Sequence, residues 1–212
     1  MSSRERILGR VRRALSDVSG EDAPIERTYL REHGDRGVEE TADLLAENLA
    51  DYRAIVHHCT AADLPATLAG MPAARGSRRS WCRRGWSSPG SRTPTPSRSR
   101  TGPSTPHELD RIDSVVTACA VAVAESGTVV LDGSPGQGRR RITLMPDQRI
   151  CVVRVPDQVV SAVPQGLEHL EPVSPLTWIS GSSATSDVGL DRVEGVHGSR
   201  TLEVIPVNRN GE

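Results

Sequence analysis

The spacing of apolar residues along the chain predicts alternating helices and strands. Residues 3–17 carry four aliphatic side chains at helical spacing with arginines on the other face, which indicates an amphipathic helix. A second helix is predicted over 38–51, a short strand over 54–59 and a third helix over 63–69. This order of helix, strand and helix is typical of an α/β fold.

The second half of the chain repeats the pattern with short valine-rich runs. Strands are predicted at 115–116, 128–131, 150–155, 178–180 and 202–207. Between them, the small residues of 118–124 are compatible with a helix, and Pro156 can open a helix that runs to Ser161. Such alternation predicts a mostly parallel sheet whose two faces are covered.

One block interrupts this pattern. Residues 75–106 contain no Leu, Ile, Val, Asp or Glu and eight Arg, so the block carries +8 and the rest of the chain carries -1 - 8 = -9. Its composition is too polar to build a core. It is interpreted as a disordered basic insertion, a patch for nucleic acid or an acidic partner, or a stretch translated out of frame.

Composition narrows the class of protein. The 212 residues suffice for one domain with a substantial core. The net charge of -1 gives no general attraction to nucleic acid, and the 2% of aromatic residues leaves few stacking platforms for single strands. There is no apolar run of about 20 residues and no secretory h-region. We therefore expect a cytoplasmic protein without nucleic-acid or membrane partners.

The four cysteines show no metal-binding spacing. They stand at Cys59, Cys82, Cys119 and Cys151, with no pair two or three residues apart. Cys119 and Cys151 lie in apolar surroundings and are expected in the core. No metal site and no disulfide framework are predicted.

The first candidate site is the segment Glu125-Ser126-Gly127-Thr128. A carboxylate followed by Ser-Gly can be held at a turn by backbone N–H groups and act as a general base or nucleophile, or contact a ligand. The alternative is a helix C-terminal turn with Gly127 in the left-handed conformation and Glu125 in solvent.

The second candidate is the glycine-rich loop of residues 133–141. The glycine backbones of this loop, Gly138 among them, allow close approach of a phosphate, which the three arginines Arg139, Arg140 and Arg141 can neutralise. No helix is expected after the loop because Pro146 follows closely, so neither the P-loop nor the dinucleotide fingerprint fits. The alternative is a mobile connection with solvated charges.

Two further motifs lie near the end of the chain. Residues 179–187 are rich in hydroxyl groups that can bind an anion or cap a helix. His197 stands between glycines just before the last predicted strand and is either a structural or a proton-transferring histidine.

These four motifs, in this order, resemble the lactate-utilisation protein C family, whose domain is the LUD domain. The family patterns match at 117–128, 138–150, 180–187 and 195–198. Departures are Ser126 for Thr, Arg149 for a His, Ser182 for Pro, Gly189 for Glu and Ser199 for Pro. The resemblance covers about residues 108–207 and fails over 75–106, which favours the out-of-frame interpretation of that block.

The resemblance implies a fold and a role. The expected fold is a parallel-rich α/β sheet flanked by helices, similar to the glucosamine-phosphate deaminase, ribose-phosphate isomerase and CoA-transferase superfold. The expected role is that of an accessory protein or subunit in the oxidation of L-lactate to pyruvate, without a redox cofactor of its own, beside iron–sulfur partner proteins. The alternative is a free-standing CoA-transferase-like or sugar-phosphate-isomerase-like enzyme.

On this interpretation, residues 1–36 form a helix and a linker arm, and 37–212 form one LUD-like domain with 75–106 anomalous. A pocket at the strand ends is expected to bind a small anionic ligand. Glu125 and His197 are the candidates for proton transfer. The expected ligand-binding residues are Thr128, Gly138, Arg140, Arg141, Ser180, Gly181, Ser183, Thr185 and Asp187.

Overall fold

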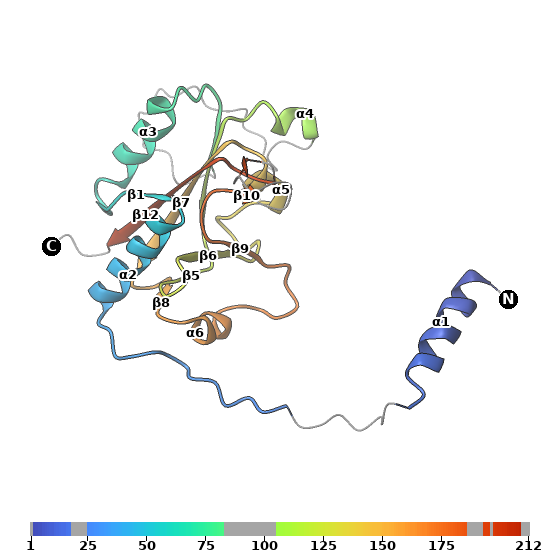
Figure 1. The fold of residues 1–212 in the computed structure, drawn as a ribbon. Coiled ribbons are helices and arrows are strands. Elements are labelled where there is room, and N and C mark those ends of the chain that lie inside the picture. Colours follow the sequence, from blue (N-terminus) through green and yellow to red (C-terminus); the bar gives the residue numbers. More distant parts are fainter. Residues whose placement is uncertain (1, 18–24, 83–104, 186–192, 196, 209–212) are drawn as a thin grey trace.

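Two β-sheets with helices packed against them form the body of the protein (Figure 1). The computed structural model describes residues 2–17, 25–82, 105–185, 193–195 and 197–208. The helices are α1 (Ser3–Ala14), α2 (Val38–Asp51), α3 (Leu64–Ala74), α4 (Pro106–Leu109), α5 (Arg140–Leu144) and α6 (Val163–Glu168).

The larger sheet is parallel. Its strands are β1 (Ile55–Val56), β2 (Cys59–Thr60), β3 (Ser80–Cys82), β4 (Ser114–Ala118), β7 (Gln148–Val155) and β12 (Thr201–Asn208). They follow the order β1-β12-β7-β4-β3, and β2 pairs with the far end of β12. All pairings of these strands are parallel, which confirms the predicted parallel-rich α/β sheet.

Both faces of this sheet are covered, as its continuous apolar strands require. On one face, Leu68 and Met71 of α3 pack against Ile150 and Val152 of β7. On the other face, Cys151 and its neighbours pack against α2 and a second sheet. Side chains of a strand alternate between faces, so the residues of β7 divide cleanly between these two cores.

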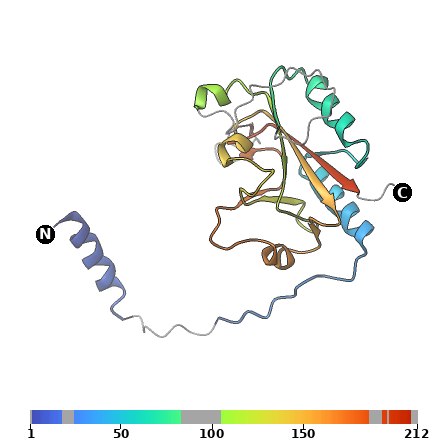
Figure 2. The same cartoon turned by 180° about the vertical axis from the view of Figure 1, so that it is seen from behind.

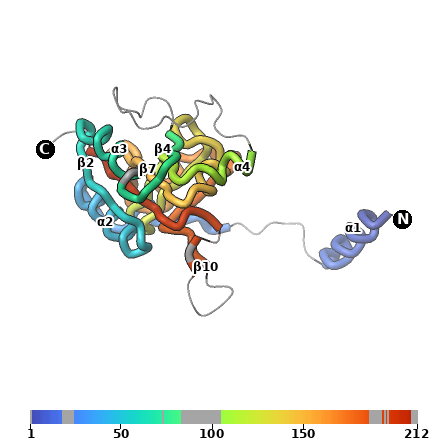
Figure 3. Tube along the Cα trace, turned by 90° about the horizontal axis from the view of Figure 1, so that it is seen from above, coloured from blue at the N-terminus to red at the C-terminus, as the bar shows by residue number. Residues whose placement is uncertain are grey.

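The second sheet was not expected from the sequence. It has the order β8-β5-β6-β9, and its strands are β8 (Val159–Val160), β5 (Val121–Val123), β6 (Thr128–Leu131) and β9 (Thr177–Ile179). Pairings of β5 with β6 and β6 with β9 are antiparallel, whereas β5 and β8 are parallel. A separate hairpin joins β10 (Ala184–Thr185) to β11 (Val193–Glu194), and Figure 3 shows β10 projecting from the body.

Helix α2 fills the space between the two sheets. Leu45 and Leu49 are fully buried there against Val129 of β6 and Val204 of β12. The observed bounds of α2 coincide with the prediction. The two leucines are four residues apart, which is helical spacing. The apolar face of α2 that the sequence predicts is therefore the face that is buried.

Helix α1 has no buried side chain and stands away from the body (Figure 2). Its serine cap is Ser2, whose hydroxyl accepts from the backbone N–H of Glu5 at 3.2 Å while the Glu5 carboxylate accepts from the N–H of Ser2 at 2.6 Å. In the part of the chain that the structure describes, no helix is long and apolar enough to span a bilayer.

Several predictions about secondary structure were wrong. Residues 118–124 are not helical but form the end of β4 and all of β5, because their small side chains pack between sheets. Residues 156–161 form a turn and β8 instead of a helix. Within the anomalous block, 80–82 form β3, which pairs with β4 and places Trp81 against the apolar cluster of Val115. Residues 83–104 of that block lie outside the described residues.

We expect Leu45→Ala to lower the free energy of unfolding by about 2–5 kcal/mol, since it removes a fully buried side chain between the sheets. Chemical denaturation of the two proteins measures this difference. Leu30→Ala is the matched control, because Leu30 is 68% exposed and its loss should change the free energy by less than about 0.5 kcal/mol. A loss below about 1 kcal/mol for Leu45→Ala would contradict the observed packing.

Candidate functional site

A cavity of about 790 Å³ lies between α5 and the segment that follows β11. Its walls are formed by Arg139, Arg140, Arg141, Leu144, Met145, Asp147, Gly195, His197 and Gly198. Two of the sequence motifs therefore meet here, the arginine-ended loop and the glycine-flanked histidine.

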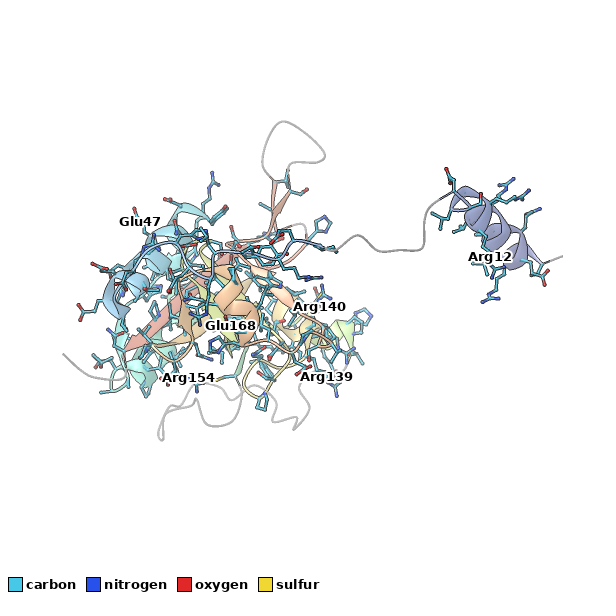
Figure 4. The ribbon with its side chains drawn as sticks, turned by 90° about the horizontal axis from the view of Figure 1, so that it is seen from below. Arg12, Glu47, Arg139, Arg140, Arg154 and Glu168 are labelled. Carbon is cyan, nitrogen blue, oxygen red and sulfur yellow. The ribbon has the colours of Figure 1, made fainter. Side chains whose placement is uncertain are left out.

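Short helix α5 presents the arginines. Ile142 is buried beside Val115, and this contact fixes the helix against the larger sheet. Arg140 and Arg141 stay exposed on the other side of the helix. Figure 4 shows Arg139 and Arg140 close together on the side of the body away from Glu47. The expectation that no helix follows the glycine-rich loop was wrong, because one turn of helix fits before Pro146.

The loop before α5 is braced from inside by Gln137. This side chain is buried, and its Oε1 accepts from the N–H groups of Asp132 (2.8 Å) and Gly133 (3.0 Å) while its Nε2 donates to the Ser134 hydroxyl. Gly138 has φ +82°, and a Cβ there would approach the Trp81 ring to 3.0 Å. These contacts favour a defined binding loop over a loose connection.

Ser183 holds the histidine segment in place. Its N–H donates to the Ser199 carbonyl at 2.9 Å, its carbonyl accepts from the Gly195 N–H at 2.8 Å, and its hydroxyl accepts from the His197 N–H at 3.3 Å. Gly195 has φ +79°, and a Cβ at this position would overlap the Arg200 side chain. The backbone thus needs glycine here, and the exposed His197 ring borders the cavity.

Positive charge dominates the cavity. Three consecutive arginines line it together with one carboxylate, that of Asp147, whose Oδ1 lies 3.7 Å from Nε of Arg200. Guanidinium groups bind carboxylates and phosphates with paired hydrogen bonds, so this wall is suited to an anion.

Glu125 lies elsewhere and is already engaged. It follows β5, and its carboxylate accepts from Nη1 of Arg36 at 2.9 Å, lies 2.9 Å from Nδ1 of His33 and is 3.5 Å from the Ser161 hydroxyl. Burial acts to raise the pKa of Glu125, but the hydrogen bonds and charges of His33 and Arg36 outweigh it and hold that pKa below its ordinary value. The residue anchors the arm that precedes α2.

Two more contacts complete the attachment of the arm. Arg31 forms a bidentate pair with Glu168 of α6 at 2.8 and 2.9 Å. Nε2 of Gln165 donates to Glu32 at 2.8 Å. The arm thus meets both the turn after β5 and helix α6.

The remaining predicted site residues that the structure describes lie outside the arginine cavity, either around Thr128 or in the β10 hairpin. Thr128 and Ser180 share a 2.6 Å hydrogen bond near Glu125, and Gly181 there lies against the backbone of Tyr52. Thr185 lies in β10. None of these four residues, nor Glu125, lines the arginine cavity. Asp187 lies outside the described residues.

The structure therefore brings together Arg140, Arg141 and His197, with Ser183 behind His197 and Gly138 in the adjacent loop. Sequence reasoning named Arg139 as one of the three arginines of the loop and Arg149 as the replacement for a family histidine, but it placed neither residue, nor Gln137, among the expected site residues. The third arginine of the motif was the signal for Arg139, and the replacement of a family histidine was the signal for Arg149. Nothing in the sequence marks Gln137 as buried.

Metal ligands do not gather in the described residues. Across these ranges, no group of three or more His, Cys, Asp or Glu side chains is placed to hold a metal ion. Cys119 and Cys151 are buried in the core, as predicted.

Comparisons with known proteins agree on a family. The LUD domain profile matches residues 95–207. A Lactate utilization protein C from Deinococcus radiodurans is 44% identical over 165 residues, 76% of this chain and 76% of the relative. Another, from Shouchella clausii, is 32% identical over 93 residues, 41% of this chain and 40% of the relative.

A solved structure shows a similar fold. The crystal structure of a DUF162 family protein from Deinococcus radiodurans superposes with a TM-score of 0.65 and 35% sequence identity. The match covers 82% of this chain and 99% of that chain. The α/β architecture with a mainly parallel sheet is therefore shared with that protein.

We expect Glu125→Gln to weaken the attachment of the arm in a pH-dependent way. Because the folded pKa of Glu125 is lowered, its contribution is present above the ordinary carboxyl value of about 4.3 and is lost as pH falls through the folded pKa. The difference in unfolding free energy from wild type should be about 0.5–1 kcal/mol at pH 7 and vanish at low pH. Chemical denaturation of wild type and variant, at pH 7 and again below the folded pKa of Glu125, measures this difference in unfolding free energy.

Glu47→Gln on the exposed side of α2 serves as the control for loss of one carboxylate. It should show no such pH-dependent difference. Equal effects of the two substitutions would mean that the His33 and Arg36 contacts contribute nothing.

Proposed function

Because the chain belongs to the LUD domain family, we propose that it is an accessory protein or subunit of L-lactate utilisation that binds a small anion in the arginine cavity. On this proposal it acts in the cytoplasm in the oxidation of lactate to pyruvate and carries no redox cofactor of its own. Electrons pass through iron–sulfur partner proteins.

The cavity between α5 and His197 is the observation that carries the proposal. A positively charged recess next to a braced glycine-containing loop suits a small carboxylate or a phosphorylated ligand. Arg140 and Arg141 would pair with the anion, and the exposed ring of His197 is the candidate for proton transfer at its rim.

The names of the relatives support the lactate role. Two relatives are called Lactate utilization protein C, and the first of them aligns with three quarters of this chain. On this proposal, partner proteins would supply the electron acceptors. Transfer of the lactate role to this chain is our proposal.

A free-standing enzyme of the CoA-transferase or sugar-phosphate isomerase type is the alternative. It needs an accessible Glu125, because a thioester at that carboxylate requires a groove large enough for CoA. Glu125 is instead paired with His33 and Arg36 of the arm. We therefore favour the accessory role, and CoA-transfer assays with wild type and Glu125→Ala would detect the alternative.

We expect the double substitution Arg140→Ala, Arg141→Ala to reduce the affinity for inorganic phosphate or pyruvate by about tenfold or more, because it removes two guanidinium partners. Isothermal titration calorimetry at fixed ionic strength measures the affinity. Arg154→Ala, an exposed arginine of β7 outside the cavity, is the matched control and should bind like wild type. Unchanged binding by the double variant would contradict the assignment of the cavity.

A genetic test addresses the lactate role. In a host whose own Lactate utilization protein C gene is deleted, expression of the wild-type chain should restore growth on L-lactate. The double arginine variant should restore it poorly while Arg154→Ala restores it fully. Failure of the wild-type chain, at normal protein levels, would count against the lactate role.

A further inference from the structure

We infer that the arginine cavity selects a doubly charged phosphate ester over a three-carbon monocarboxylate, and that buried Arg149 is the positioning residue behind this selectivity. The inference deepens the proposed function, on which it rests, by naming the chemical class of the ligand. Three observations carry it: the charge of the walls, the burial of Arg149 and the size of the cavities.

Charge on the walls exceeds what a monocarboxylate can balance. Arg139, Arg140 and Arg141 supply three positive charges, and Asp147 supplies one negative charge that also faces Arg200. A lactate or pyruvate ion brings one negative charge. A phosphate monoester brings about -1.5 to -2 at pH 7 and three acceptor oxygens, which suit several guanidinium donors.

Arg149 adds a buried positive charge beneath the same helix. Its side chain is 1% exposed, Nη1 donates to the Thr143 carbonyl at 3.0 Å and Nη2 donates to the Thr117 hydroxyl at 3.3 Å. Nε has no partner. Among the residues that the structure describes, no carboxylate forms an ion pair with this guanidinium.

Such a charge is costly unless a negative charge balances it. Burial lowers the pKa of Arg149, whereas the sulfur atoms of Cys119 and Cys151 beside it act in the opposite direction. The two cysteines hydrogen-bond to each other in the core, and Cys151 also hydrogen-bonds to Arg149. The cavity on the outer side of α5 is where an anion from solution can approach without entering that core.

Arg149 acts through α5 and does not line the cavity. The carbonyl that it holds belongs to Thr143, two residues after Arg141. Arg149 therefore fixes the helix that presents the anion-binding side chains and raises the positive potential behind it. The first effect acts on any ligand of the cavity, whereas the second grows with the charge of the ligand, since the Coulomb energy is proportional to that charge.

Cavity size points to a ligand larger than lactate. Sites of 300–1,000 Å³ typically hold molecules of drug size, and the main cavity measures about 790 Å³. A second cavity of about 620 Å³ shares Arg139 and Arg140 and extends past Trp81 and Ser134. A phosphate on the shared arginines thus leaves room for the organic part of an ester on either side.

The test compares ligands of different charge on the intact protein. Calorimetry at pH 7.5 and fixed ionic strength measures dissociation constants for inorganic phosphate, glycerol phosphate, pyruvate and L-lactate. We expect wild type to bind glycerol phosphate about tenfold or more tightly than pyruvate or lactate. Equal or tighter binding of the monocarboxylates would overturn the inference while leaving the anion cavity intact. Absence of binding by all four ligands would overturn the proposed function as well.

Variants at one position test the role of Arg149. Arg149→Met should reduce the preference for glycerol phosphate over pyruvate to about threefold or less, and Arg149→Lys should retain most of it because the charge remains. A purely structural role of Arg149 would weaken the binding of both ligands equally. An unchanged ratio of the two dissociation constants in Arg149→Met therefore overturns the inference. If this variant does not fold, the ratio in Arg149→Lys decides: loss of preference despite the retained charge overturns it.

Cys151→Ser is the control for the neighbouring thiol. The preference should be unchanged in this variant. A preference that rises in Cys151→Ser would identify the Cys151 sulfur, and not the ligand, as the counter-charge of Arg149, and would overturn the assignment.

Discussion

Strand β7 is the element on which the rest of the structure depends. It pairs with β12 over eight residues and with β4 over five, and every one of its residues except Arg154 is buried. A strand enclosed in this way must satisfy its backbone through its neighbours and its side chains through packing on both faces. The cores under α2 and under α3 therefore share one backbone, and α5 is positioned at the end where β7 begins.

The polar residues at the beginning of β7 are organised differently from its apolar remainder. Nε2 of Gln148 donates to the buried carboxylate of Glu203 at 2.8 Å, and that carboxylate also meets His57 and Arg75. Arg149, on the opposite face, has no such carboxylate among the described residues. On one face of the strand start, the buried carboxylate is thus paired with positive groups. On the other face, the buried guanidinium of Arg149 lies beneath α5 without a carboxylate partner among the described residues.

The sequence predicted those elements whose apolar residues follow a helical period or form a continuous run. Helix α2 and the long strands β7 and β12 belong to this class. Strand β5 was missed because alanine is compatible with both states, and β3 was missed because Ser80 and Trp81 lie in a polar, arginine-rich context. The arginine cavity followed from motif chemistry, but the separation of Glu125 from it depends on the chain's path in space. The burial of Gln137 and Arg149 depends on tertiary packing, which no local pattern shows.

The attachment of the arm has a consequence for where the folded unit begins. Arg36, which is bound to Glu125, immediately precedes Gly37, the N-cap of α2, whose N–H donates to Glu40. Docking of the arm and formation of the first turn of α2 are therefore linked in free energy, so that each is more favourable when the other is in place. The N-terminal boundary of the folded unit accordingly lies before Arg31, which makes the first ion pair to α6. It does not lie at the start of α2.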